Sequence, residues 1–271
     1  MRVGFLQFAP RFGRVEENGQ LILDALRDVE ADLLVLPELS LTGYSFKDRA
    51  ELERLAENPL SSDFVQELSW LLAARNLHVV VGLAEKVGSR IYNSALLVGP
   101  LGILHTYRKL HLFDAEKELF DPGDLPLQVV EVKEARIGLM VCFDWAFCEV
   151  ARALALQGAD LLCHPSNLVL DHGPRTMQTR CLENGVFAIT ANRTGSEKRA
   201  GTMRRFTGRS QLVAPDGTVV LRAPAQRRAV QVIEVDLRAA RDKKLTQRNH
   251  LLRDRRPAFY GPLCAEPPER V

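Results

Sequence analysis

"ARIGLMVCFD" (residues 135–144) repeats the pattern of "MRVGFLQFAP" (residues 1–10) within one chain of 271 residues. In both stretches an arginine precedes an apolar run of the kind that forms a buried strand. Two more pairs of similar stretches follow in the same order: "ADLLVLPE" (31–38) with "ADLLCHPS" (159–166), and "LLVGPLGIL" (96–104) with "QLVAPDGTVVL" (211–221). The chain therefore carries one pattern of strands and helices twice.

This duplication predicts the architecture. Strands that alternate with helices favour an α/β fold. Each predicted sheet needs an apolar partner for its second face, so we expect two similar halves, about 1–125 and 135–240, to pack sheet against sheet. The result is a four-layer α-β-β-α sandwich with internal pseudo-twofold duplication. No Pro-rich or Ser-rich linker separates the halves, so residues 1–271 are predicted to form a single domain with a C-terminal tail from about 246 to 271.

Two helices have readable ends. Ser61 or Ser62 is placed to cap a helix that runs through Asn76. A second helix is expected over 146–157 and should end at Gly158, a residue favoured just beyond a helix C-terminus. Three segments lack clear periodicity and are expected to be the least regular: 110–126, 195–208 and the chain after Thr246.

Composition favours a small molecule as the partner. The chain is 46% apolar and 26% charged, which excludes a disordered or fibrous protein. Its 36 Lys and Arg nearly balance 34 Asp and Glu, leaving +2, so no bulk charge attracts nucleic acid or an acidic membrane. The start of the chain lacks the pattern of a signal peptide, and no apolar run is long enough to span a bilayer. We therefore expect no membrane partner.

The five cysteines are odd in number and widely spread: Cys142, Cys148, Cys163, Cys181 and Cys264. Without an export signal, this pattern is typical of reduced thiols in the cytoplasm, and a cytoplasmic location is expected. Cys163 is expected to fill the core on a buried strand.

The remaining polar motifs predict no cofactor. The histidines, including His164 and His172, lack the spacing of metal ligands, so no metal is expected. The basic stretch "RDKKLTQRNHLLRDRRP" (241–257) is interrupted by acids and lacks aromatic residues that could stack on bases. We expect a solvated helix there and a tail that braces a subunit interface of a homodimer or a higher homo-oligomer, an assembly implied by the family resemblance described below.

Three chemically active side chains follow predicted strands. In α/β sheets, functional groups gather beyond the carboxyl ends of strands. Glu38 follows "LLVLP", Lys109 follows "ILHTYR", and Cys142 ends "RIGLMVC". Each alone has an ordinary explanation: a carboxylate that orders a loop, a lysine at a solvated strand end beside Arg108, and a small apolar filler.

Together, these residues lie in motifs that resemble the nitrilase, or carbon-nitrogen hydrolase, superfamily. The motifs are "LPELSLTGY" around Glu38, "YRKLHLF" around Lys109 and "IGLMVCFDWAFCE" around Cys142. "RCLENGVFAITANRTG" and "FTGRSQLVAPDG" agree as well, so the resemblance runs nearly end to end. It implies a Glu-Lys-Cys triad, an α-β-β-α sandwich and association as a dimer.

The resemblance also implies a role for each residue. Cys142 would attack the carbon of an amide, ammonia would leave, and Glu38 would activate the water that hydrolyses the thioester. Lys109 and the backbone N–H of Phe143 would hold the oxyanion. Glu116 matches a second glutamate that family members place in the site, where it would position the substrate or Lys109.

The chemistry sets further expectations. A free thiol ionises little at neutral pH, so Lys109 and a helix starting near Trp145 or Ala146 should favour a thiolate at Cys142. Removing one oxyanion donor costs about 3 kcal/mol of barrier, so Lys109→Ala should be nearly inactive while its fold stays largely intact. Cys148 is not expected to act as a nucleophile. The aromatic residues expected to line the pocket are Tyr44, Phe46, Phe113 and Trp145.

We therefore predict an amidase-type hydrolase acting on a small linear amide or N-carbamoyl compound. The nearest alternative is a nitrilase acting on a small nitrile. True nitrilases of this superfamily commonly place Trp-Glu after the cysteine, whereas Phe143 and Asp144 follow Cys142 here, which favours amides. An alternative of another class is a non-catalytic binding module, but such a module should have lost part of the triad.

Overall fold

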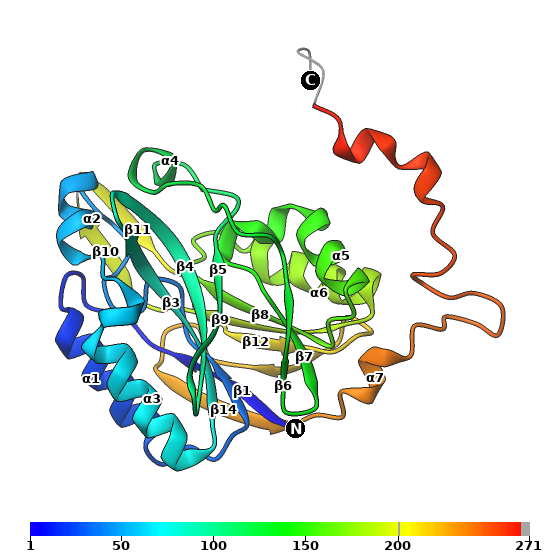
Figure 1. The fold of residues 1–271 in the computed structure, drawn as a ribbon, viewed down its shortest axis with the longest axis horizontal. Coiled ribbons are helices and arrows are strands. Elements are labelled where there is room, and N and C mark those ends of the chain that lie inside the picture. Colours follow the sequence, from blue (N-terminus) through cyan, green and yellow to red (C-terminus); the bar gives the residue numbers. More distant parts are fainter. Residues whose placement is uncertain (200, 267–271) are drawn as a thin grey trace.

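The computed structural model describes residues 1–199 and 201–266, and two six-stranded sheets lie face to face in this part of the chain (Figure 1). The first sheet contains β1 (Arg2–Gln7), β2 (Leu33–Val35), β3 (His78–Val87), β4 (Arg90–Gly99), β5 (Gly102–Arg108) and β14 (Ala229–Glu234). The second contains β6 (Val129–Val132), β7 (Ala135–Leu139), β8 (Leu161–Ser166), β9 (Phe187–Asn192), β12 (Gln211–Val213) and β13 (Val219–Arg222).

Both sheets use the same pairing pattern. Each has a run of parallel strands, β1-β2-β3 in the first and β7-β8-β9 in the second. One antiparallel strand flanks each run, β14 beside β1 and β6 beside β7. Two antiparallel strands extend the other side, β4 and β5 in the first sheet, β12 and β13 in the second. The predicted duplication is confirmed, and β14 links the end of the second repeat to the first sheet.

Helices cover the outer face of each sheet. They are α1 (Val15–Leu26) and α3 (Asp63–Arg75) on the first sheet, and α5 (Cys148–Leu156) and α6 (His172–Asn184) on the second. Strand β3 shows why both faces are apolar: Val79 and Val81 pack with the helices, whereas Val80 packs between the sheets. The predicted four-layer α-β-β-α sandwich is confirmed.

The two predicted helices are present with adjusted ends. The Ser62 hydroxyl accepts a hydrogen bond of 3.1 Å from the backbone N–H of Val65 and caps α3, so Ser62 rather than Ser61 is the cap. Helix α5 begins at Cys148, later than the predicted position 146. The reason is a 3-10 turn, η2 (Cys142–Ala146), that occupies the chain before it.

The segment 195–208 is more regular than expected. It forms a separate hairpin of β10 (Ser196–Arg199) and β11 (Thr202–Arg205). Its strands are mostly charged and carry no apolar alternation, so the order comes from tertiary contacts of Glu197, which is buried and paired with Arg193. The remaining elements before the tail are α2 (Arg49–Leu55), η1 (Pro59–Ser61) and α4 (Glu116–Leu119).

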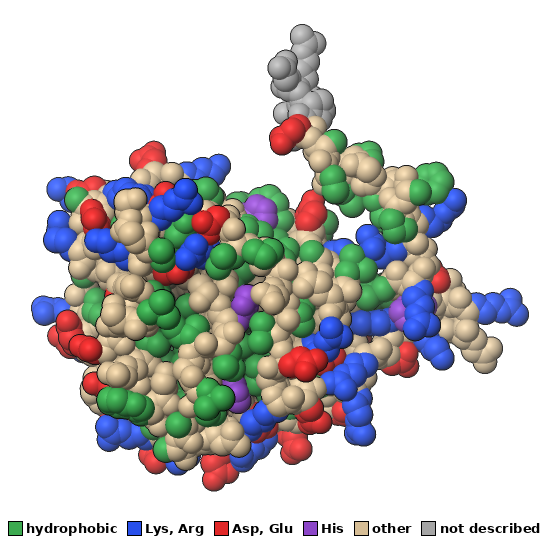
Figure 2. Space-filling view, in the orientation of Figure 1, with side chains coloured by type: hydrophobic (Ala, Val, Ile, Leu, Met, Phe, Trp, Pro, Cys, Tyr) green, Lys and Arg blue, Asp and Glu red, His purple; other side chains and the backbone are tan. Residues whose placement is uncertain are grey.

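The predicted solvated helix over 241–257 is wrong. Helix α7 (Arg238–Arg241) ends where that segment begins, and the tail then runs away from the sandwich through turns to η3 (Pro257–Phe259) and η4 (Gly261–Cys264) (Figure 1). Lys and Arg side chains are spread along it (Figure 2). The tail packs too little apolar surface against the sandwich to support an isolated helix, and Leu245 and Phe259 are mostly exposed. Across the described ranges, no helix combines the length and apolarity that a bilayer crossing requires.

Candidate active site

Glu38 lies in a fully buried position just beyond β2. Its backbone packs against Gly82 of β3, where a Cβ atom would lie 2.5 Å from the Glu38 Cα, so only glycine permits this approach. Its Oε1 accepts hydrogen bonds from Lys109 Nζ at 2.8 Å and from Asn93 Nδ2 at 2.6 Å. Its Oε2 is buried and has no hydrogen-bond partner among residues 1–199 and 201–266. One carboxylate oxygen is thus anchored and the other is available.

Lys109 follows β5 and is buried between two carboxylates. Its Nζ lies 2.8 Å from Glu38 Oε1 and 2.7 Å from Glu116 Oε2. Burial alone would lower the pKa of this amine, but the attraction of Glu116 and Glu38 outweighs it and raises the pKa well above its usual value. Lys109 is therefore a fixed cation in the site.

Glu116 is the first residue of α4 and connects Lys109 to the loop after β2. Its Oε1 accepts a hydrogen bond of 2.7 Å from the Tyr44 hydroxyl, and its Oε2 accepts one of 3.1 Å from the backbone N–H of Phe113. Burial raises the pKa of the Glu116 carboxyl, opposed by Lys109. Burial and the charge of Glu116 raise the pKa of Tyr44 well above its usual value, so its hydroxyl stays a donor.

Cys142 has a backbone conformation that is rare for a residue with a side chain, with φ of +42°. Contacts hold the chain on both sides of it. The Asp144 carboxylate accepts a hydrogen bond of 2.8 Å from the Val141 N–H, and the Cys142 carbonyl oxygen lies 2.8 Å from His164 Nε2. The nearby backbone N–H of Asn167 lowers the pKa of the Cys142 thiol, against the effect of burial. The strained conformation is therefore supported by packing and hydrogen bonds.

The surroundings of Cys142 oppose the expected thiolate. Burial raises the pKa of this thiol well above its usual value, and the negative charge of Glu38 raises it further. The positive charge of Lys109 lowers it by less. The helix contribution also differs from the expectation, because α5 begins at Cys148 and not near Trp145. These surroundings favour the neutral thiol, so attack by Cys142 would require a base.

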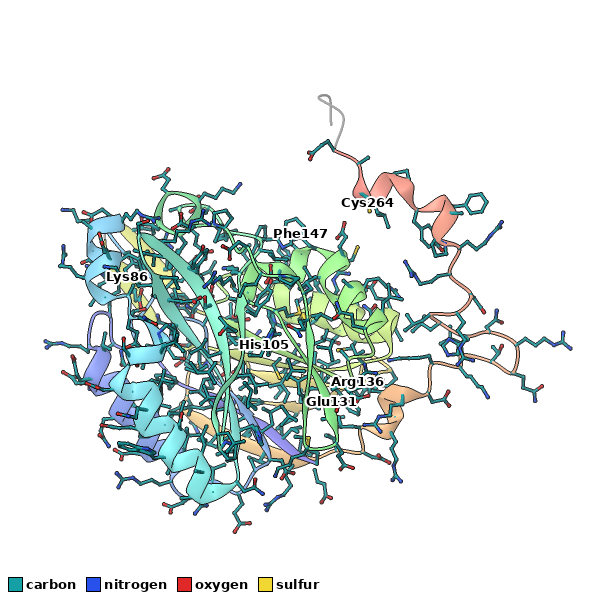
Figure 3. All side chains as sticks on the ribbon, viewed as in Figure 1. Lys86, His105, Glu131, Arg136, Phe147 and Cys264 are labelled. Carbon is teal, nitrogen blue, oxygen red and sulfur yellow. The ribbon has the colours of Figure 1, made fainter. Side chains whose placement is uncertain are left out.

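The structure places most of the expected aromatic residues around Cys142, but Phe46 packs instead in an apolar cluster with Phe120. Tyr44, Phe113, Phe143 and Trp145 line one pocket with it. The ring centroids of Phe113 and Phe143 are 5.0 Å apart, and those of Phe143 and Trp145 are 6.1 Å apart. Side chains fill the space between the sheets (Figure 3). The pocket is lined by loop residues that follow β2, β5, β7 and β8. Nowhere in the described ranges do three or more His, Cys, Asp or Glu side chains gather as metal ligands would.

A comparison with known protein families shows the family to which this chain belongs. The family model of the carbon-nitrogen hydrolases matches residues 2–244. The chain belongs to the carbon-nitrogen hydrolase family. It is therefore an enzyme of that family, and the alternative of a non-catalytic binding module falls away.

Individual relatives of this carbon-nitrogen hydrolase have different named activities. A nitrilase of Pyrococcus abyssi is 39% identical over 264 residues, 96% of this chain and 99% of its own. An (R)-stereoselective amidase of a Pseudomonas species is 35% identical over 276 residues, 100% of this chain and 97% of its own. In a solved structure of an amidase mutant from Nesterenkonia sp. AN1, the active-site cysteine carries the acetamide moiety of fluoroacetamide. That structure aligns with a TM-score of 0.80 and 26% identity, covering 95% of this chain and 94% of its own.

Several polar residues of this carbon-nitrogen hydrolase site were missed by the sequence analysis. Asn93 supports Glu38 from the middle of β4, and His164 supports Cys142 from β8. The Asp144 carboxylate accepts a hydrogen bond of 2.7 Å from the Tyr107 hydroxyl and lies 2.8 Å from His111 Nδ1, in addition to its bond from the Val141 N–H. One signal could have found two of them: a polar side chain inside an otherwise apolar strand needs a buried partner.

Proposed function

We propose that this hydrolase cleaves the carbon-nitrogen bond of a small linear amide or N-carbamoyl compound, with Cys142 as nucleophile and ammonia as product. The observation that carries the proposal is the buried network in which Lys109 joins Glu38 and Glu116, while one Glu38 oxygen has no hydrogen-bond partner in the described part of the chain. The charges of all three residues act on the Cys142 thiol. A base and a cation thereby act on a thiol that lines an apolar pocket.

In the first half-reaction, Glu38 accepts the thiol proton as the Cys142 sulfur attacks the carbonyl carbon. The electron pair of the C=O bond moves to oxygen, and Lys109 and the Phe143 N–H stabilise this oxyanion. The oxyanion then re-forms the C=O bond and breaks the C–N bond. Glu38 returns its proton to the departing nitrogen, which leaves as ammonia. The product on the enzyme is a thioester.

In the second half-reaction, water takes the place of ammonia. Glu38 accepts a proton as the water oxygen attacks the thioester carbon, and Lys109 again faces the oxyanion. When the C–S bond breaks, the proton returns to the Cys142 sulfur and the carboxylic acid leaves. One amide and one water yield one acid and one ammonia. Because the pKa of Cys142 is raised, its sulfur is a poor leaving group unless it is protonated as the C–S bond breaks. Glu38 can supply that proton, so it has a role in both half-reactions.

The choice between amide and nitrile rests on the residues after Cys142. In true nitrilases Trp-Glu commonly follows the cysteine, so Asp144 stands at the position of that glutamate. The Asp144 oxygens already form polar contacts with the Val141 N–H, the Tyr107 hydroxyl and His111 Nδ1. Its function is to hold the turn and not to protonate a substrate. An N-carbamoyl group presents the same H₂N–C=O unit as a primary amide. A nitrile remains the second candidate because one relative of 39% identity is named a nitrilase.

Ammonia release from matched substrates tests the proposal. Butyramide, butyronitrile and N-carbamoyl-β-alanine would be incubated with the wild-type enzyme and with Cys142→Ala. We expect ammonia from an amide or carbamoyl compound, none from Cys142→Ala, and a transient mass increase at Cys142 equal to the acyl group. Activity confined to the nitrile would select the second candidate, and equal activity of Cys142→Ala would reject the nucleophile.

We also propose that the enzyme forms a homodimer in which the tail after Thr246 takes part. The tail leaves the sandwich and carries the apolar side chains of Phe259 and Leu263, which are 66% and 60% exposed. Light scattering of the full chain and of a chain ending at residue 245 tests this. A dimeric full chain with a monomeric shortened chain is expected, and two monomers would contradict it.

A further inference from the structure

Arg204 brings a cationic side chain to the pocket that holds Cys142. It lies on β11 and lines this pocket together with Phe143 and Leu168. Its guanidinium carbon is 5.8 Å from the ring centroid of Tyr44. In the hairpin register Arg204 pairs with Glu197 of β10. The position of the guanidinium is therefore set by the hairpin.

The hairpin is itself fastened to the active site. Glu197 is buried and accepts hydrogen bonds from the backbone N–H of Ser45 at 2.7 Å and of Tyr44 at 3.3 Å. It also forms a short ion pair with the buried guanidinium of Arg193. These contacts occupy Glu197, so it does not neutralise Arg204 across the strands.

The charge of Arg204 is only weakly balanced. Its nearest carboxylate in the described part of the chain is that of Asp114, at 3.9 Å, and the Asp114 side chain is 68% exposed. The guanidinium donates no hydrogen bond to any residue within 1–199 or 201–266. Five N–H donors in a planar fork are thus available beside the pocket.

Asn167 is a second unsatisfied polar group in the same pocket. The residue is 3% exposed, and neither its Nδ2 nor its Oδ1 has a hydrogen-bond partner among the described residues. Burying an amide without partners is unfavourable unless a ligand supplies them. Asn167 and Cys142 line the same pocket, so the Asn167 amide is available to a ligand that reaches the sulfur.

We propose that the substrate is the monoamide of a small dicarboxylic acid, and that Arg204 binds the free carboxylate. This inference rests on the proposed function and specifies its substrate. The apolar walls formed by Trp145, Leu168 and Val169 suit a short carbon chain between two polar ends. A guanidinium fork binds a carboxylate through two parallel hydrogen bonds.

The charges of the reacting residues explain why a cation at Arg204 would favour binding of an anionic substrate. Glu38 and Glu116 contribute two carboxylates against the single ammonium of Lys109, so the reacting end repels an anionic substrate. Arg204 offsets that repulsion from its own position in the lining of the pocket. A cationic amide of the same length would instead meet the guanidinium.

Three amides of equal length test the inference. They are the monoamide of glutaric acid, pentanamide and 5-aminopentanamide, which are anionic, neutral and cationic. We expect the wild-type kcat/KM to be roughly tenfold or more higher for the anionic amide than for pentanamide. That ratio should collapse in Arg204→Gln, be partly restored in Arg204→Lys, and shift toward the cationic amide in Arg204→Glu.

Arg205→Gln is the matched control, because Arg205 is the next residue of β11 and is exposed outside the pocket. It should keep the wild-type ratio. An unchanged ratio in Arg204→Gln, or a wild-type preference for the neutral or cationic amide, would overturn the inference while leaving amide hydrolysis in place.

Binding provides a readout that needs no turnover. Glutarate should bind Cys142→Ala and lose roughly tenfold or more affinity in Cys142→Ala/Arg204→Gln, measured by calorimetry. If no amide releases ammonia, the proposed function fails, and the glutarate comparison still decides whether Arg204 recognises a carboxylate. Equal affinity in both variants would reject that recognition.

Discussion

His164 donates a hydrogen bond of 2.8 Å from its Nε2 to the carbonyl oxygen of Cys142. A carbonyl oxygen can only accept, so the ring proton lies on Nε2, and Nδ1 accepts from the Thr190 hydroxyl at 3.1 Å. Burial lowers the pKa of His164 to about 4, so the ring is neutral at physiological pH. This buried histidine thus helps to hold Cys142 in its left-handed conformation.

The first prediction concerns stability in acid. The unfolded chain binds a proton at His164 with the ordinary pKa of 6.5, and the folded protein does so only at about 4. Its contribution to stability is therefore complete above pH 6.5 and is lost as the pH falls to 4, by roughly 3 kcal/mol in total. Urea unfolding at pH 7 and pH 4.5 should show this loss. In His164→Asn the loss of unfolding free energy between pH 7 and pH 4.5 should be smaller than in the wild type. An identical pH dependence in both proteins would show that His164 does not cause the loss.

A second prediction revises the expected effect of Lys109→Ala. Lys109 is fully buried between Glu38 and Glu116, so its removal leaves two buried carboxylates without a counter-charge. Breaking a buried pair in this way costs about 3–5 kcal/mol. Lys109→Ala should therefore lose stability as well as at least a hundredfold in kcat. Denaturant unfolding and ammonia release measure the two effects.

A charge-matched variant separates these two effects. Lys109→Met combined with Glu38→Gln and Glu116→Gln removes all three charges together. It should recover much of the stability in urea and remain inactive. A triple variant as unstable as Lys109→Ala would show that packing of the lysine, and not its charge, supports the fold.

A third prediction addresses the hairpin of β10 and β11. Glu197→Gln leaves the guanidinium of Arg193 buried without a full counter-charge and should cost about 3–5 kcal/mol. Glu51→Gln weakens a pair to Arg199 whose side chain is 35% exposed, so it should cost under about 1 kcal/mol. Urea midpoints of the two variants make the comparison. Equal losses would mean that the Arg193 pair does not anchor the hairpin.

The layered fold and the strand-end residues could be predicted from the sequence for one physical reason. Buried strands read as apolar runs, and the residue that ends such a run lies at an edge of the sheet. Glu38 and Cys142 end two such runs, and Ser62 carries the hydroxyl that a helix start requires. These signals are local, so they can be recognised in the sequence without knowledge of the tertiary structure.

The rest of the site depends on contacts between distant segments. Arg204 and Glu197 lie in mostly charged strands with no apolar period, and their positions follow from the register of the hairpin. The resting state of Cys142 depends on the balance of burial, two carboxylates and one ammonium, which no spacing along the chain encodes. The Nδ2 and Oδ1 atoms of Asn167 lack hydrogen-bond partners among the described residues, and this can be recognised only from the three-dimensional structure of the pocket.

The last prediction identifies the reactive sulfur. Cys148 and Cys264 are exposed, and Figure 3 places Cys264 on the tail away from the sandwich. Cys163 and Cys181 are fully buried, and burial raises the pKa of both thiols. In a Cys148→Ser/Cys264→Ser background, iodoacetamide should therefore modify Cys142 alone, because it lines the pocket and has Glu38 as a base.

Peptide mass analysis and residual ammonia release should follow the same time course in that background. The unmodified background protein should retain wild-type activity, since neither exposed cysteine contacts the pocket. Adding Glu38→Gln should slow the alkylation of Cys142 by about a hundredfold, because the thiol then has to ionise without a general base against its raised pKa. Rapid alkylation in that variant would mean that the sulfur is already a thiolate and that Lys109 outweighs burial. Inactivation of the wild-type enzyme that tracks modification of Cys148 alone would remove Cys142 from the nucleophile position.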